Sequence, residues 1–181
     1  MPEEFSFGGS QKKIVITGPE SCGKTTLSIE LAKILKCSVV PEMARDYLNN
    51  IDRAYVYEDL YEIAIWQMIR EDSLLPKKAS RISDTDLLTL KIWSLEKFGK
   101  CDPRIENEFV LRKPKLYLLC APDVPWKSDP LRENADDRKR LYERYKSELD
   151  AYHYPYIEIS GLGEERMTNA IEQMKAFFSN K

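Results

Sequence analysis

Gly18-Pro19-Glu20-Ser21-Cys22-Gly23-Lys24-Thr25-Thr26 is the most informative segment of the chain. It fits the pattern G-x-x-x-x-G-K-[ST], in which two glycines, a lysine and a hydroxyl residue occupy fixed positions. The apolar run Ile14-Val15-Ile16 precedes it and predicts a buried strand. The residues that follow repeat at helical spacing: Leu27, Leu31 and Leu35. This strand–loop–helix context favours a phosphate-binding loop over a glycine-rich turn that binds nothing.

The chemistry of such a loop follows from its residue types. Glycines let the backbone curl so that successive N–H groups point at phosphate oxygens, and the N-terminus of the next helix adds partial positive charge. Lys24 is expected to reach the β- and γ-phosphates of ATP, and the hydroxyl of Thr25 to bind Mg²⁺. The predicted nucleotide-binding residues are Gly18, Glu20, Ser21, Cys22, Gly23, Lys24, Thr25 and Thr26.

Composition indicates an ordinary globular protein. The 181 residues are 43% hydrophobic and carry a net charge of -2, which fits one domain and predicts neither nucleic acid nor a membrane as partner. The acidic start Met1–Phe5 lacks the layout of a secretion signal. The four cysteines stand far apart, which indicates a reduced, intracellular protein. We therefore expect it in the cytoplasm.

Strands and helices alternate along the chain. The predicted strands lie at about residues 13–17, 37–40, 115–120 and 156–160, with a further strand around Ile82 that ends near Asp84. The predicted helices lie at about residues 24–36, 57–75, 87–98 and 133–150, and a closing helix includes Met167 to Phe178. Residues 100–114 are mixed and charged and receive no element. The alternation predicts a three-layer α/β domain with about five parallel strands, a P-loop NTPase fold, over residues 13–181 after a tail at 1–12.

Acidic residues follow two of the predicted strands. The carboxyl ends of parallel strands are where ligands bind in open α/β sheets. Glu42 is therefore predicted as a base or as an acceptor for a substrate hydroxyl, the alternative being a surface ion pair with Arg45. Asp84 is expected to organise Mg²⁺ near the phosphate loop, whereas Asp86 either assists it or caps the next helix.

A proline-rich loop and a charged helix are predicted to form a helical lid at about residues 123–150. Arg132 and Arg138 lie nearest the proline-rich hinge, where they would neutralise charge on a transferring phosphoryl group. The alternative is a solvated, salt-bridged helix.

Trp66 and His153 are ring side chains that stand out in the remaining segments. Trp66 lies beside Gln67 in a predicted helix, where it either contacts a flat ligand ring or packs in the core. His153 is the only histidine and receives no role, so acid–base chemistry is expected to rest on carboxylates.

Four blocks of sequence carry a family resemblance: Gly18–Thr26, Pro41–Tyr47, Ile82–Thr89 with Trp93, and Cys120–Arg132. Together they resemble the ribosylnicotinamide kinase domain of NadR-type proteins, a branch of the phosphate-loop kinases. The likeness runs from Lys13 to the last helix. It implies ATP- and Mg²⁺-dependent transfer of the γ-phosphoryl group to the 5′-hydroxyl of nicotinamide riboside, which gives nicotinamide mononucleotide in NAD salvage.

The resemblance also implies roles for single residues. Lys24 and the loop amides would hold the phosphates, and Thr25 and Asp84 would organise magnesium. Glu42 or Asp84 would orient and deprotonate the attacking hydroxyl. Arg132 and Arg138 would close as a lid. The implied nucleoside pocket consists of Glu42, Arg45, Tyr47, Trp66, Asp84, Asp86 and Trp93.

Related bifunctional proteins also carry an adenylyltransferase domain with an H-x-G-H signature. This chain has one histidine, so no such domain is expected in it. The acidic acceptor region, with Glu42, Asp84 and Asp86, favours a neutral or cationic nucleoside such as nicotinamide riboside. Two alternatives stay open: a kinase for another nucleoside or a nucleoside monophosphate, and a non-catalytic ATP-binding regulatory module. The oligomeric state is not predicted.

Overall fold

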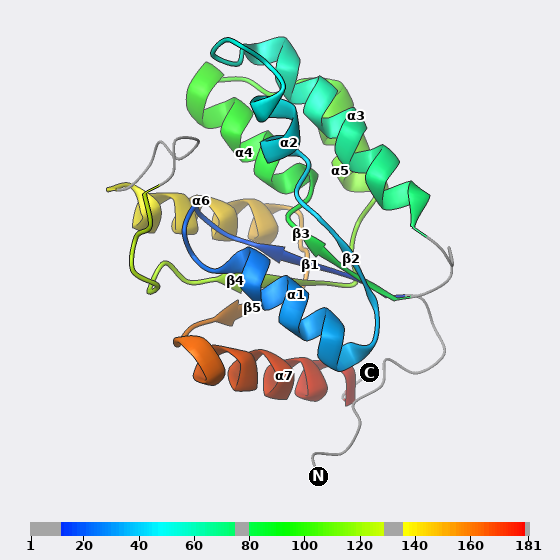
Figure 1. The fold of residues 1–181 in the computed structure, drawn as a ribbon, viewed down its shortest axis with the longest axis vertical. Helices are drawn as coiled ribbons and strands as arrows, with labels where there is room; N and C mark the ends of the chain where they lie inside the picture. The colour runs from blue at the N-terminus through cyan, green and yellow to red at the C-terminus, as the bar shows by residue number, and fades with distance from the viewer. Residues whose placement is uncertain (1–11, 75–79, 129–135, 180–181) are drawn as a thin grey trace.

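A parallel β-sheet forms the middle of the molecule. The structure is a computed structural model, and it describes residues 12–74, 80–128 and 136–179. The strands stand in the order β2-β3-β1-β4-β5 (Figure 1). In chain order they are β1 (Lys13–Thr17), β2 (Ser38–Val40), β3 (Arg81–Asp84), β4 (Leu116–Cys120) and β5 (Tyr156–Ile159). All neighbouring strands run parallel, so the loops that follow them gather at one edge of the sheet.

Helices cover both faces of this sheet. Helices α1 and α7 pack on one face, and α2 to α6 lie on the other side (Figure 1). Their bounds are α1 (Lys24–Leu35), α2 (Ala44–Asn49), α3 (Tyr57–Ser73), α4 (Leu87–Phe98), α5 (Pro103–Leu111), α6 (Arg138–Ala151) and α7 (Gly163–Ser179). The predicted three-layer P-loop fold is confirmed.

Alternation along the central strands explains the two layers of core. In β1, Ile14 and Ile16 pack with Leu31 of α1 and Met174 of α7. Val15 points the opposite way, into a cluster with residues of α3 to α6. Because successive strand residues face opposite sides, one apolar run buries side chains in both layers.

Helix α5 was not predicted from the sequence. Asp102 caps it by accepting a hydrogen bond from the N–H of Arg104 at 2.8 Å, and Pro103 occupies its first turn. Only Ile105 and Phe109 of this helix are buried. Two apolar residues four apart in a charged segment gave a weak periodic signal, although the cap and the proline mark a helix start.

The predicted lid and tail lie partly outside the described residues. Helix α6 begins at Arg138, and residues 129–135, including Arg132, are outside the described ranges. Of the predicted tail, only Lys12 is described. Its backbone carbonyl accepts a hydrogen bond from the N–H of Arg81 at 2.9 Å, so it continues the alignment of β1 with β3.

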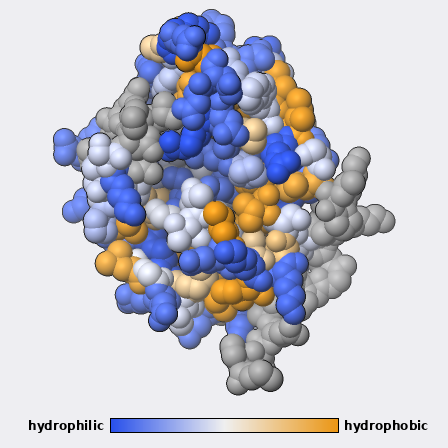
Figure 2. Space-filling model, viewed as in Figure 1, coloured by the Kyte–Doolittle hydropathy of each residue, from blue (hydrophilic) through white to orange (hydrophobic). Residues whose placement is uncertain are grey.

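The surface mixes polar and apolar side chains. Figure 2 shows hydrophilic residues over much of one face, with apolar residues in smaller groups between them. Among the described residues, no helix is both long and apolar enough to span a bilayer.

Candidate active site

The phosphate loop joins β1 to α1 with two glycines in conformations that other residues rarely adopt. Gly18 has φ +134°, and a Cβ there would lie 2.7 Å from the carbonyl oxygen of Cys120. Gly23 has φ +80° and occupies the N-cap of α1. The loop can therefore pass close to β4 and turn its amides toward the start of α1.

Lys24 lies folded over this loop. Its Nζ donates to the carbonyl oxygens of Gly18 at 3.0 Å and Pro19 at 2.6 Å. Burial works to lower the pKa of Lys24, but the nearby Cys22, Tyr145 and acidic side chains outweigh it and raise that pKa. Lys24 is therefore a positive charge held at the loop, which is the property that binding of phosphate requires.

Thr25 and Asp84 meet beside Lys24. Asp84 ends β3, and the Thr25 side chain lies close enough to its carboxylate to favour the ionised form. Burial raises the pKa of Asp84, while Thr25 and Lys24 counteract that rise. The Oδ1 atom of Asp84 is buried without a hydrogen-bond partner within the described part of the chain. A hydroxyl and a carboxylate oxygen of this kind fit Mg²⁺, which prefers oxygen ligands.

Glu42 follows β2 and lies at the same edge of the sheet. Burial raises its pKa, as do the charges of Asp84 and Glu20, whereas Lys24 and Arg45 work against the rise. A carboxylate with a raised pKa is a better proton acceptor than an exposed one. Glu42 therefore has the surroundings of a general base within electrostatic reach of Lys24.

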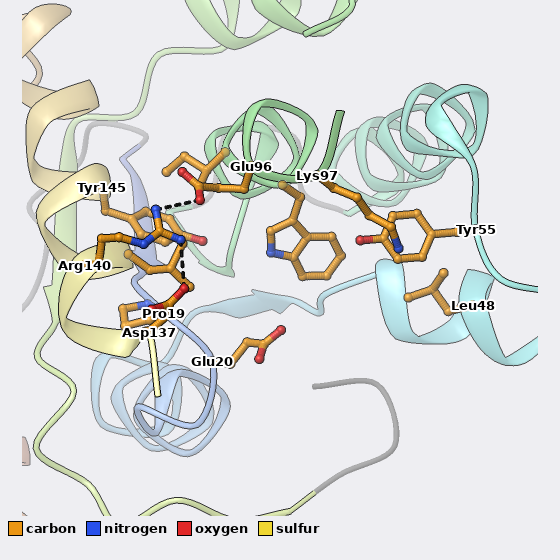
Figure 3. A pocket seen from close by; sticks show the side chains of 12 residues that line it. Pro19, Glu20, Leu48, Tyr55, Glu96, Lys97, Asp137, Arg140 and Tyr145 are labelled. Atoms are coloured by element: carbon orange, nitrogen blue, oxygen red, sulfur yellow. Dashed lines mark hydrogen bonds and ion pairs between the residues drawn. The ribbon is translucent and has the colours of Figure 1, made fainter. Parts of the chain in front are cut away.

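Two adjoining cavities open over the phosphate loop. The phosphate-loop cavity has a volume of about 340 Å³ and is lined by Gly18, Glu20, Ser21, Cys22, Gly23, Lys24, Thr25, Thr26, Glu42, Arg45, Leu48, Thr89, Trp93, Val124, Lys127 and Tyr145. The α4–α6 cavity, drawn in Figure 3, has a volume of about 330 Å³. Its lining is Pro19, Glu20, Leu48, Tyr55, Ile92, Trp93, Glu96, Lys97, Asp137, Arg140, Leu141 and Tyr145. The cavities share Glu20, Leu48, Trp93 and Tyr145.

The predicted nucleotide-binding residues thus lie together, and Glu42, Arg45 and Trp93 join them on the lining. Arg138 also approaches the loop. Its Nη1 donates to the carbonyl oxygens of Ser21 at 3.2 Å and Val124 at 2.7 Å. The first residue of α6 therefore links the predicted lid directly to the phosphate loop.

Three predicted substrate contacts have other partners in the structure. Asp86 caps α4 by accepting from the N–H of Leu88 at 3.0 Å, and it also accepts from the Tyr117 hydroxyl at 2.7 Å. This is the capping role that the sequence left open. The rings of Tyr47 and Trp66 pack edge to face, 5.3 Å apart, and neither side chain belongs to the lining of either cavity. The Tyr47 hydroxyl donates instead to Asp59.

Sequence reasoning missed Arg166, a buried arginine of α7. Its Nη1 donates to the carbonyl oxygen of Cys22 at 2.8 Å, inside the phosphate loop. Its other nitrogens donate to the carbonyl oxygens of Gly161 and Ala121, and it forms an ion pair with Asp123. Arg166 therefore positions the phosphate loop from 144 residues away in the sequence. Arg166 lies between Glu165 and Met167 in the sequence, and no local pattern marked its side chain as buried.

No site residue was predicted at Tyr145 of α6, although the spacing of Leu141, Tyr145 and Leu149 indicates the apolar face of a helix. The structure places it on both cavities, with its hydroxyl donating to the Thr89 Oγ1 atom at 3.3 Å. The apolar periodicity of α6 was a correct signal for burial. It carried no information about what the helix packs against.

A model of the AAA domain family matches residues 13–166. The chain belongs to this family. It is also 29% identical over 136 residues to the trifunctional NAD biosynthesis/regulator protein NadR of Salmonella typhimurium, a match that covers 71% of this chain and 33% of that protein. The chain thus spans about a third of this relative. The resemblance to NadR-type proteins drawn from the four sequence blocks is confirmed at this level.

Solved structures share the fold. A NadR protein in complex with NR superposes with a TM-score of 0.77 at 19% identity, covering 94% of this chain and 52% of that one. Thymidylate kinase from Ehrlichia chaffeensis superposes with a TM-score of 0.69 at 14% identity, covering 93% and 99%. The fold of this chain is therefore that of the P-loop nucleoside and nucleotide kinases.

Proposed function

We propose that the protein is an ATP- and Mg²⁺-dependent kinase that phosphorylates the 5′-hydroxyl of nicotinamide riboside to give nicotinamide mononucleotide. The observation that carries this proposal is the pair of adjoining cavities, which meet at Glu20, Leu48, Trp93 and Tyr145 beside Lys24 and Glu42. One cavity holds the phosphate loop, and the other has aromatic and aliphatic walls with a few charged groups. Such an arrangement gives a phosphate donor and a nucleoside acceptor separate places with a common boundary.

The similarity to NadR supports the choice of acceptor. That relative is named for NAD biosynthesis, and a solved NadR structure contains NR. Glu20, which lines both cavities, and Glu42, which lines the phosphate-loop cavity, are compatible with the cationic ring of nicotinamide riboside. A salvage kinase of this kind would work in the cytoplasm, as expected from the reduced cysteines.

The reaction uses the residues of the phosphate loop to position the donor. Lys24 and the loop amides bind the β- and γ-phosphates, and Arg138 adds positive charge from the start of α6. Glu42 accepts the proton of the 5′-hydroxyl as that oxygen forms its bond to the γ-phosphorus. The bond between the γ-phosphorus and the β,γ-bridging oxygen breaks, and ADP leaves.

Thr25 and Asp84 would hold Mg²⁺, and the ion would neutralise charge that develops on the phosphate oxygens. This division makes Glu42 the base and Asp84 the metal-organising carboxylate. It can be tested because the two side chains can be changed separately: Glu42 follows β2, whereas Asp84 ends β3.

The first test is ATP consumption by the purified chain with Mg²⁺ and a panel of acceptors: nicotinamide riboside, thymidine, cytidine, uridine and thymidine monophosphate. We expect strong stimulation by nicotinamide riboside alone. Stimulation by another acceptor would overturn the assignment of nicotinamide riboside as the substrate. If none of the acceptors stimulates ATP consumption, the non-catalytic ATP-binding module is favoured. Lys24→Ala should reduce the rate by about 100-fold or more without unfolding the chain.

The roles of the two carboxylates can be separated with matched amide variants. Glu42→Gln should lower kcat by about 100-fold or more and leave the Mg²⁺ concentration needed for half-maximal rate unchanged. Asp84→Asn should raise that Mg²⁺ concentration. If Asp84→Asn lowers kcat at saturating Mg²⁺ as strongly as Glu42→Gln, and leaves the Mg²⁺ requirement unchanged, the assignment of the base is wrong.

A further inference from the structure

Glu20 is an acidic residue within a loop whose other features favour anions. The sequence assigned it to the nucleotide site with the rest of the loop. The structure places it on the lining of both cavities. In Figure 3 its carboxylate projects from the loop into the α4–α6 cavity, toward the side where Leu48 and Tyr55 lie. Its side chain therefore faces the space that the proposed function gives to the acceptor.

The other charged groups of the α4–α6 cavity come from α4, from α6 and from Asp137, the residue just before α6. Arg140 forms ion pairs with Glu96 at 2.7 Å and with Asp137 at 3.1 Å, so its cation faces two carboxylates (Figure 3). Lys97 lies over the ring of Tyr55, with its Nζ 3.5 Å from the ring centroid. The lining thus has three carboxylates and two cations, and the phosphate loop contributes one of the carboxylates.

Glu20 is also electrostatically close to the proposed base. Burial is the main cause that raises the pKa of Glu42, and the negative charge of Glu20 adds to it. The carboxylate of Glu20 is therefore close enough to the proposed base to affect it, and Glu20 shares the lining of both cavities with Trp93. A nucleoside that places its 5′-hydroxyl near Glu42 would place its ring within the field of Glu20.

We infer that Glu20 is a specificity-determining residue that selects acceptor nucleosides with a cationic ring and disfavours anionic acceptors. This inference rests on the proposed function. A carboxylate and a fixed positive charge about 5 Å apart in partly solvated surroundings attract strongly enough to change relative rates by about tenfold to a hundredfold. Attraction of this kind acts on charge and not on shape, so it discriminates between rings of the same size.

The decisive comparison uses two acceptors of nearly the same shape. Nicotinamide riboside has a cationic ring, and its dihydro form has a neutral one. We expect Glu20→Gln to lower the ratio of kcat/KM for the cationic acceptor to that for the neutral acceptor by about tenfold or more. Glu20→Asp, which keeps the charge, should preserve most of that ratio. Glu30→Gln, which removes an exposed carboxylate of α1, is the matched control and should leave it unchanged. ADP should be measured by chromatography, because the dihydro ring absorbs near the wavelengths of coupled assays.

A second measurement uses the unaltered protein, so it does not depend on the folding of a variant. Raising the ionic strength should reduce kcat/KM more for the cationic acceptor than for the neutral one, because salt screens the attraction. An unchanged ratio in Glu20→Gln, or equal salt dependence for both acceptors, would overturn the inference while leaving the kinase proposal intact. If the unaltered protein phosphorylates neither acceptor, the inference about Glu20 and the proposed function are both overturned.

Discussion

Replacing Arg166 by glutamine tests whether a helix at the end of the chain holds the phosphate loop in place. The arginine is 5% exposed and donates to three backbone carbonyls, those of Cys22, Gly161 and Ala121. It also forms an ion pair with Asp123. Glutamine is shorter and uncharged, so it leaves several of these acceptors without a donor. Breaking a buried charged cluster from one side costs about 3–5 kcal/mol.

A loss of about 4 kcal/mol corresponds to a fall in Tm of about 8–16 °C for a chain of this size. Circular dichroism at rising temperature measures it directly. Arg104→Gln is the matched control, because the Arg104 side chain is 61% exposed and its ion pair with Asp102 is solvated. That variant should lose no more than about 1 kcal/mol.

Arg166→Gln should also change nucleotide binding. Arg166 contacts the Cys22 carbonyl and not the cavity, so its removal loosens the loop without removing a phosphate contact. We expect KM for ATP to rise by more than KM for the acceptor. The reasoning is refuted if Arg166→Gln is as stable as Arg104→Gln, or if the KM for ATP is unchanged in the folded variant.

Two further predictions concern the loop backbone and a buried carboxylate. Gly18→Ala should lower the free energy of unfolding by about 2–6 kcal/mol, because it adds backbone strain and a close contact with the Cys120 carbonyl. Gly99→Ala has open space around it and should lower the free energy of unfolding by about 1–2 kcal/mol. Urea unfolding compares the two variants, and equal midpoints would contradict the close approach of Gly18 to Cys120. The Arg53 guanidinium holds the pKa of Asp59 well below its usual range, so this carboxylate stabilises the fold at neutral pH and loses its contribution as the pH falls below about 4. Asp59→Asn should therefore have a lower Tm than the parent protein at pH 7, and the two Tm values should converge toward pH 3. A constant difference in Tm across that range would argue against the ionised pair.

Tryptophans show where prediction from sequence reached its limit. Trp66 and Trp93 both stand in segments with helical periodicity, and both were named as ring contacts. The structure brings Trp93 to both cavities and pairs Trp66 with Tyr47. Periodicity gives the face of a helix that is buried, but only the packing of α4 against α6 determines which ring borders the site.

The sequence by itself determined the phosphate loop, the strand before it and the helix after it, because a loop of this kind is built from consecutive residues whose backbone freedom and side-chain chemistry act locally. It also determined the layer order, since strands alternating with helices have few ways to pack. The tertiary structure alone decided which distant side chains serve that loop. Arg166 reaches Cys22 from α7, and Tyr117 of β4 donates a hydrogen bond to the second carboxylate oxygen of Asp86. Such contacts depend on the relative placement of whole elements, which many weak packing interactions set together and no local pattern records.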